Sequence, residues 1–74
     1  MSAVLPNEHD VVALLVDLPQ YNLSAGDMGA VIHCYGQPGV YEVEFVDAGG
    51  KTKAVVTLKA HEILKLNWAP AATA

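Results

Sequence analysis

The chain has 74 residues, of which 53% are hydrophobic, and a net charge of −4 that comes from eight acidic residues, four lysines and no arginine. This length allows one domain at most, and the hydrophobic content excludes a disordered chain. The acidic balance and the absence of arginine argue against nucleic acid as a partner.

The first strand is predicted at residues 11–16, a β-branched and aliphatic run that is too short for a helix. Residues 18–29 contain proline, asparagine and glycine without hydrophobic periodicity, which predicts a loop. We interpret its end, LSAGDMGAV, as the corner that leads into the second strand. Gly26 and Gly29 are expected to supply backbone angles there that other residues resist.

The second strand is predicted at residues 30–36. A period of two places Ile32 and Cys34 on the core face of this strand and His33 and Tyr35 on the other face. The sequence GQPG that follows indicates a tight turn.

The third and fourth strands are predicted at residues 40–46 and 51–59, joined by the hairpin loop DAGG. In the third strand the alternation of VYEVEFV places the glutamates outward. In the fourth strand Lys53 is expected across from Glu42 or Glu44.

A single helical turn is predicted at residues 60–63, and a short last strand at 64–68 is expected to return toward the first. This order predicts an all-β fold, a small five-stranded SH3-like barrel with one short helical turn before the last strand. The barrel is predicted over residues 10–68, between an N-terminal tail (1–9) and a mobile C-terminal tail (69–74). The predicted core consists of Val12, Leu14, Ile32, Cys34, Val43, Phe45, Val56 and Leu58.

Cysteine content and hydrophobic runs bear on the location of the protein. Cys34 is a single cysteine and forms no internal disulfide, which fits a reducing compartment. The first residues contain no basic and apolar leader pattern, and nowhere do 18 apolar residues run together. We therefore expect a cytoplasmic protein that does not enter a membrane.

Over residues 10–58 the motifs DVVAL, GDMG, YEVEF and TL resemble a family of small bacterial proteins catalogued as domain of unknown function 4926. The resemblance implies an SH3-like barrel and no established activity, and it makes an accessory or antitoxin-like role beside a larger partner plausible. Relatives more often have an acidic or aliphatic residue in place of His33. Any role of His33 or Cys34 would therefore be peculiar to this protein.

The residues with chemical potential do not form a recognisable catalytic or cofactor pattern. Ser24, Asp27 and a histidine suggest a hydrolase triad, but the serine lacks a G-x-S-x-G elbow and a following helix. We expect these two side chains to bond their own turn instead, so that the protein is not an enzyme. No phosphate-binding glycine motif is present, and His9, His33, Cys34 and His61 are too scattered for a metal site. We expect no cofactor.

A binding surface remains as the functional hypothesis. Asp17, Tyr21, Tyr35 and Trp68 are candidates for a groove that holds an extended peptide, although each aromatic side chain fits a core position or a dimer contact equally well. Outward apolar side chains suggest a two-fold homodimer, with Val40, Val46, Val55 and Leu66 as contacts.

The sequence thus predicts a non-catalytic protein-interaction or accessory module with a protein partner that it does not identify. The alternative is a nucleic-acid or translation-associated barrel of the KOW kind. The chain has a weaker, shape-level similarity to KOW barrels and to nitrile-hydratase-associated barrels. The acidic charge favours the first interpretation.

Overall fold

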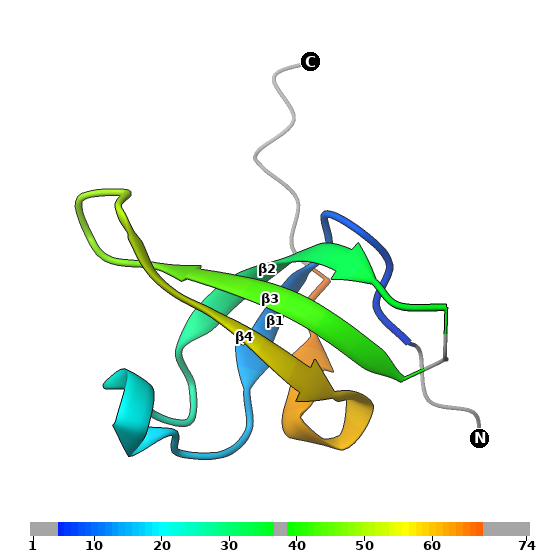
Figure 1. Ribbon diagram of the computed structural model, residues 1–74, viewed down its shortest axis with the longest axis horizontal. Coiled ribbons are helices and arrows are strands. Elements are labelled where there is room, and N and C mark those ends of the chain that lie inside the picture. The colour runs from blue at the N-terminus through cyan, green and yellow to red at the C-terminus, as the bar shows by residue number, and fades with distance from the viewer. Residues whose placement is uncertain (1–4, 37–38, 68–74) are drawn as a thin grey trace.

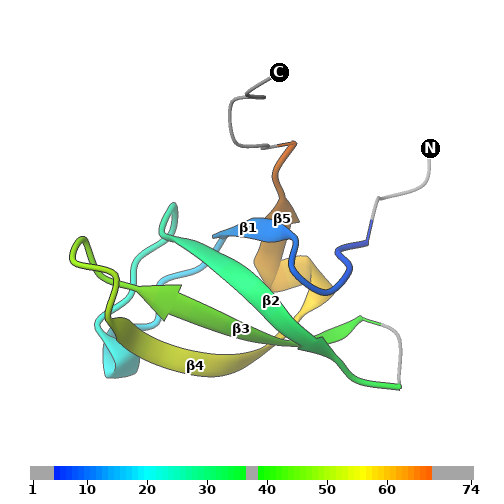
Figure 2. The same ribbon diagram turned by 90° about the horizontal axis from the view of Figure 1, so that it is seen from above.

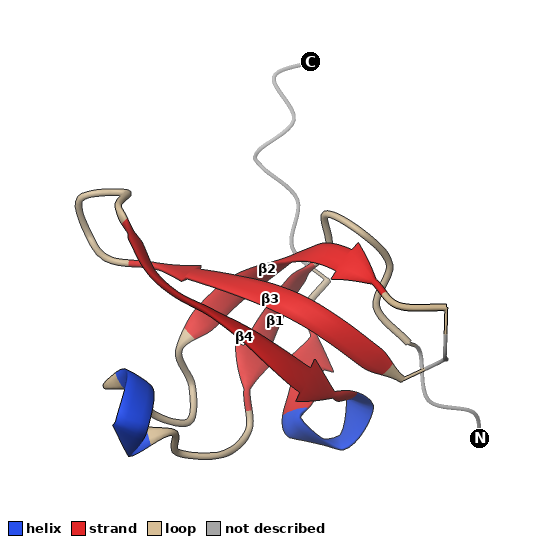
Figure 3. Cartoon of the chain, viewed as in Figure 1, coloured by secondary structure: helices blue, strands red, loops and turns tan. Residues whose placement is uncertain are grey.

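The computed structural model describes residues 5–36 and 39–67, which form one antiparallel sheet of five strands and two short 3₁₀ turns (Figures 1 and 3). The predicted all-β fold is confirmed. The described part of the chain has no helix of the length and apolar character that crossing a membrane requires. In chain order the elements are β1 (Val11–Leu14), η1 (Pro19–Tyr21), β2 (Met28–Cys34), β3 (Val40–Val46), β4 (Thr52–Lys59), η2 (Ala60–Glu62) and β5 (Ile63–Lys65).

The strands follow the order β4-β3-β2-β1-β5, and every neighbouring pair is antiparallel. The last strand pairs with the first, as predicted, with Leu14 opposite Ile63 and Val12 opposite Lys65. Figure 2 shows the sheet from above, with β4 at one margin and β1 and β5 at the other. No ladder joins β4 to β5 within the described residues, so the sheet has two edges.

One side of the curled sheet forms the core. Six of the eight predicted core residues are buried there, and Phe45 is 1% exposed. Cys34 is half-buried and packs against this cluster. The buried hydrophobic residues are Val12, Leu14, Leu23, Val31, Tyr41, Val43, Phe45, Val56, Leu58 and Ile63.

The prediction for Ile32 is wrong, because its side chain is 43% exposed. The cause is a β-bulge. Val31 lies opposite Val43 and His33 lies opposite Glu42, so Ile32 is an extra residue in β2. Before the bulge Val31 points into the core, and after it Cys34 does, whereas strict alternation would place these two residues on opposite faces of β2.

The connection between β1 and β2 is more ordered than the predicted loop. It contains η1, and the backbones of Leu18 and Leu23 exchange two hydrogen bonds of 2.9 and 3.1 Å. This bridge delivers the Leu23 side chain to the core. Sequence periodicity did not indicate Leu23 because the residue belongs to no strand.

The predicted corner before β2 is confirmed at Gly26, whose φ is 99°. The Gly26 amide donates to the carbonyl of Leu14 (2.7 Å), and the Leu14 amide donates to the carbonyl of Asp27 (2.8 Å). The explanation for Gly29 is wrong: it lies inside β2 without a positive φ. Because glycine has no Cβ, β2 can approach β3 closely at this position.

Four of the predicted segments reach beyond the described residues, namely the N-terminal tail, the GQPG turn, the last strand at 64–68 and the C-terminal tail. In the GQPG turn, residues 37 and 38 lie outside them, and Gly39 has a φ of 88°. The C-terminal tail at 69–74 lies outside them as well. Toward the N-terminus, the His9 amide donates to the carbonyl of Val31 (2.7 Å), so part of the predicted tail runs along β2.

Candidate protein-binding surface

The sheet side opposite the core carries exposed apolar side chains. In an antiparallel ladder, residues directly opposite each other project to the same side. One row across the sheet runs through Val11, Ala30, Glu44 and Val55, and a second runs through Leu64, Ala13 and Met28. We define the outer face as Val11, Ala13, Met28, Ala30, Val46, Val55 and Leu64.

The outer face is apolar and exposed. Met28 is 54% exposed, Leu64 is 52% exposed and Val46 is 49% exposed. A shallow depression of about 220 Å³ lies on it, lined by Val11, Met28, Gly29, Ala30, Glu44 and Val46. Glu44 is the one charged residue of this lining. Its Oε2 accepts a hydrogen bond from the Thr52 hydroxyl (2.5 Å), which ties the carboxylate toward β4.

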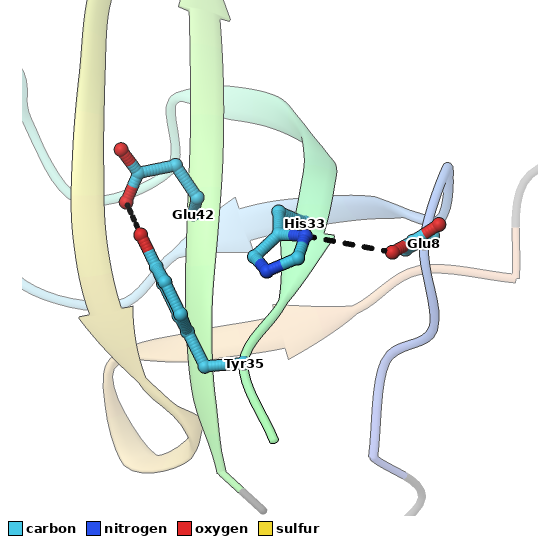
Figure 4. A network of polar contacts seen from close by, with 4 residues as sticks. All are labelled: Glu8, His33, Tyr35 and Glu42. Atoms are coloured by element: carbon cyan, nitrogen blue, oxygen red, sulfur yellow. Dashed lines mark hydrogen bonds and ion pairs between the residues drawn. The ribbon is translucent and has the colours of Figure 1, made fainter. Parts of the chain in front are cut away.

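Polar side chains border the outer face where β2 ends (Figure 4). The Glu42 Oε1 accepts hydrogen bonds from the Tyr35 hydroxyl (3.1 Å) and the Thr57 hydroxyl (2.6 Å). His33 lies beside them, with its ring edge-on to that of Tyr35 at a centroid distance of 4.8 Å. Its Nδ1 is 3.7 Å from Glu8 Oε2, in a pair so exposed that it contributes little stability. An apolar centre with a polar rim is typical of protein interfaces.

The peptide-groove candidates do not come together. Asp17 and Tyr21 lie in the connection before β2, whereas Tyr35 directly follows the other end of that strand. Figure 1 shows η1 and the C-terminal end of β2 at opposite ends of the sheet. The Asp17 Oδ1 accepts a hydrogen bond from the Ala25 amide (2.9 Å), so this carboxylate stabilises the loop. Trp68 lies outside the described residues.

Of the four candidate dimer contacts, Val46 and Val55 belong to the outer face and are exposed. Val40 and Leu66 are half-buried, and the Leu66 amide donates to the carbonyl of Val11 (2.9 Å). Met28 and Leu64 were not predicted from the sequence to face outward. Alternation gave no signal for Met28, because the phase that places Ile32 and Cys34 in the core places Met28 there too, and the bulge at Ile32 reverses this.

The expected ion pair of Lys53 is not observed among the described residues. Glu42 lies opposite Thr57 and Glu44 lies opposite Val55. Lys53 instead sits at an irregularity, since Phe45 pairs with Ala54 and Val46 pairs with Thr52. Both glutamates instead accept hydrogen bonds from threonine hydroxyls of β4.

Asp27 and Ser24, which were considered for catalysis, stabilise the backbone of their own turn. The Asp27 Oδ2 accepts a hydrogen bond from the Ser24 amide (2.9 Å), and the Asp27 amide donates to the Ser24 carbonyl (3.0 Å). Across residues 5–36 and 39–67, no three histidine, cysteine, aspartate or glutamate side chains gather closely enough for a metal ion.

Within the described part of the chain, the pKa of one side chain is shifted. Burial raises the pKa of the Tyr41 hydroxyl above its ordinary value of 10.0, and the neighbouring Cys34 adds to the increase. The pKa of Tyr41 is higher in the folded state than in the unfolded state, so folding favours the neutral phenol. The contribution of this group to the free energy of unfolding is complete below the unfolded pKa and is lost as pH rises through the folded pKa. Tyr41 faces the core, so this shift reflects burial and indicates no catalytic site.

The Asp27→Ala substitution is expected to lower the free energy of unfolding by about 1 kcal/mol, because it removes the acceptor of the Ser24 amide. Denaturant titration measures this change. The control is Ser24→Ala, which keeps that amide and is expected to be within about 0.5 kcal/mol of the wild type. A loss from Ser24→Ala as large as that from Asp27→Ala would contradict this account of the corner.

Comparison with known proteins gives one match. The model of a family described as "Domain of unknown function (DUF4926)" matches residues 8–65. Searches of curated proteins and of solved structures return no match. The matched segment contains all five strands and the whole outer face.

Proposed function

The chain belongs to the family described as "Domain of unknown function (DUF4926)", and from this premise we propose that it is a non-catalytic protein-interaction or accessory module that binds through its outer face. The observation that carries the proposal is the row of exposed apolar side chains on the sheet side opposite the core. Exposing Met28, Val46, Val55 and Leu64 to water is unfavourable, and burying them against another chain removes that cost.

A second copy of the chain is the proposed occupant. Two-fold pairing places the same patch on both sides of the interface and ends the assembly at a dimer. The apolar surface of Met28, Val46 and Val55 is self-complementary in chemistry, because apolar groups pack against apolar groups. The Thr52 hydroxyl draws the Glu44 carboxylate toward β4, which limits repulsion between the two copies.

Further parts of the proposal concern the fold and the location. The strand order, the 3₁₀ turn before β5 and the pairing of β5 with β1 support an SH3-like barrel. A half-buried free cysteine supports a reducing compartment such as the cytoplasm. The KOW-like alternative gains no support from the outer face, whose depression is lined by a carboxylate and no lysine.

Light scattering coupled to size exclusion tests the dimer. At tens of micromolar we expect a mass of about twice 7.8 kDa, because the outer faces bury each other. Val46→Glu and Val55→Glu each place a charge in the interface and are expected to reduce the mass toward that of one chain. The control is Tyr21→Glu, an exposed position on η1 outside the outer face. A wild-type mass near 7.8 kDa would contradict the proposal.

A further inference from the structure

The sheet has a long free edge at β4. This strand has eight residues and pairs with β3 on one side, and no described strand pairs with its other side. Figure 2 shows β4 at the margin of the sheet. An edge strand presents a row of backbone donors and acceptors to another chain, and its length sets how many hydrogen bonds can form.

The ladder fixes which backbone groups point outward from this edge. The Ala60 amide donates to the carbonyl of Gly39 (2.8 Å), which continues the register in which Val40 lies opposite Lys59. Because hydrogen-bonded and non-hydrogen-bonded pairs alternate, the backbone groups of Val55, Thr57 and Lys59 point away from β3. The hydrogen bond of the Lys59 amide agrees with this, because the amide donates to the Glu62 carboxylate (2.8 Å) and not to β3.

Lysines gather along this edge in an otherwise acidic chain, and the Glu62 carboxylate beside the Lys59 amide is the acidic group that the hydrogen bonds place there. Lys51 directly precedes β4, Lys53 is its second residue and Lys59 its last, and all three are exposed. They are three of the four lysines of the chain. Between them the exposed side chains of Val55 and Thr57 are of the kind that pairs well across strands.

This distribution disfavours pairing of β4 with a second β4. Antiparallel pairing of two copies would bring the Lys51 and Lys53 end of each strand against Lys59 of the other. Like charges directly opposite each other destabilise a sheet. Pairing of β4 with an acidic strand is favourable instead, because the carboxylates of that strand face lysines at both ends.

We propose that the free edge of β4 binds an extended acidic segment of another protein by β-strand addition. The segment forms backbone hydrogen bonds with Val55 and Thr57, and its acidic residues at both ends face Lys53 and Lys59. This inference goes beyond the proposed dimer, since it uses the edge of the sheet and a different partner. The two surfaces share the Val55 side chain, but the edge contacts the segment through the backbone.

A blocked peptide, Glu-Glu-Thr-Val-Thr-Val-Glu-Glu, titrated into labelled protein and followed by NMR, tests the inference. We expect the largest shifts at the amides of Val55 and Thr57. Reversing both lysines, Lys53→Glu with Lys59→Glu, is expected to weaken binding roughly tenfold, because two charge pairs become repulsive. The matched control peptide has lysine in place of every glutamate, and it is expected to bind the reversed variant better than the wild type.

Two further variants separate the edge from the outer face. Thr57→Pro removes one outward amide without removing a backbone hydrogen bond to β3, and it lies outside the defined outer face, so it is expected to lower peptide affinity while the fold persists. Val46→Glu, designed to disrupt the dimer, is expected to bind the acidic peptide as the wild type does. Equal binding of the acidic and basic peptides, shifts centred elsewhere, or no shifts at all would overturn the inference.

Discussion

Phe45→Ala is expected to lower the free energy of unfolding by about 3–5 kcal/mol. Among the residues that the structure describes, Phe45 is the largest fully buried side chain, and it lies on β3, next to the central strand of the sheet. Truncating it removes apolar contacts and leaves a cavity that neighbouring strands cannot fill. Because small domains are only marginally stable, this loss approaches the whole stability of the protein.

Thermal and denaturant unfolding measure the effect of Phe45→Ala. The matched control is Tyr21→Ala, which truncates an aromatic side chain that is 42% exposed on η1. It is expected to change the free energy of unfolding by about 0.5 kcal/mol or less. Equal losses from the two substitutions would contradict the assignment of the core to the side of the sheet that Phe45 faces.

Gly29→Ala is expected to destabilise the protein by about 1–3 kcal/mol, although alanine suits a strand no worse than glycine. A Cβ at this position would lie 2.8 Å from Val43 Cγ1, 2.9 Å from the Glu44 carbonyl oxygen and 2.9 Å from Phe45 Cδ1. The carbonyl oxygen belongs to the backbone of β3 and cannot move without disturbing the ladder. The strands must therefore separate at the centre of the sheet.

Gly36→Ala is the matched control for Gly29→Ala. A Cβ at Gly36 has no neighbour within 4 Å among residues 5–36 and 39–67, and Gly36 has no positive φ. We expect its free energy of unfolding to match that of the wild type within about 0.5 kcal/mol. A neutral Gly29→Ala variant would show that β2 and β3 do not approach each other as closely as the structure describes.

The sequence predicted β3 and β4 well because their hydrophobic alternation is local. The bounds of β3 and the inward positions of Tyr41, Val43 and Phe45 are confirmed. In β2 the same reasoning failed at Ile32, because a bulge shifts the alternation and leaves no mark on composition. Leu23 was missed for another reason, since it reaches the core from a connection without periodicity.

The candidate surface was predictable only in part. Alternation alone indicated that Val46 and Val55 point outward, and the structure places both on the outer face. Met28 and Leu64 join them because β1 pairs with both β2 and β5, which is a long-range property of the fold. Long-range topology also explains why Tyr21 and Tyr35 lie apart, since β2 separates them along its full length.

The central claim is that the outer face is a protein interface occupied by a second copy of the chain. Isotope-filtered NMR on a mixture of labelled and unlabelled protein tests it most directly, because only contacts between two chains produce a signal. The account predicts contacts between protomers at the methyl groups of Met28, Val46 and Val55. Contacts between protomers confined to other residues, or none at concentrations where the wild type is expected to be dimeric, would contradict it.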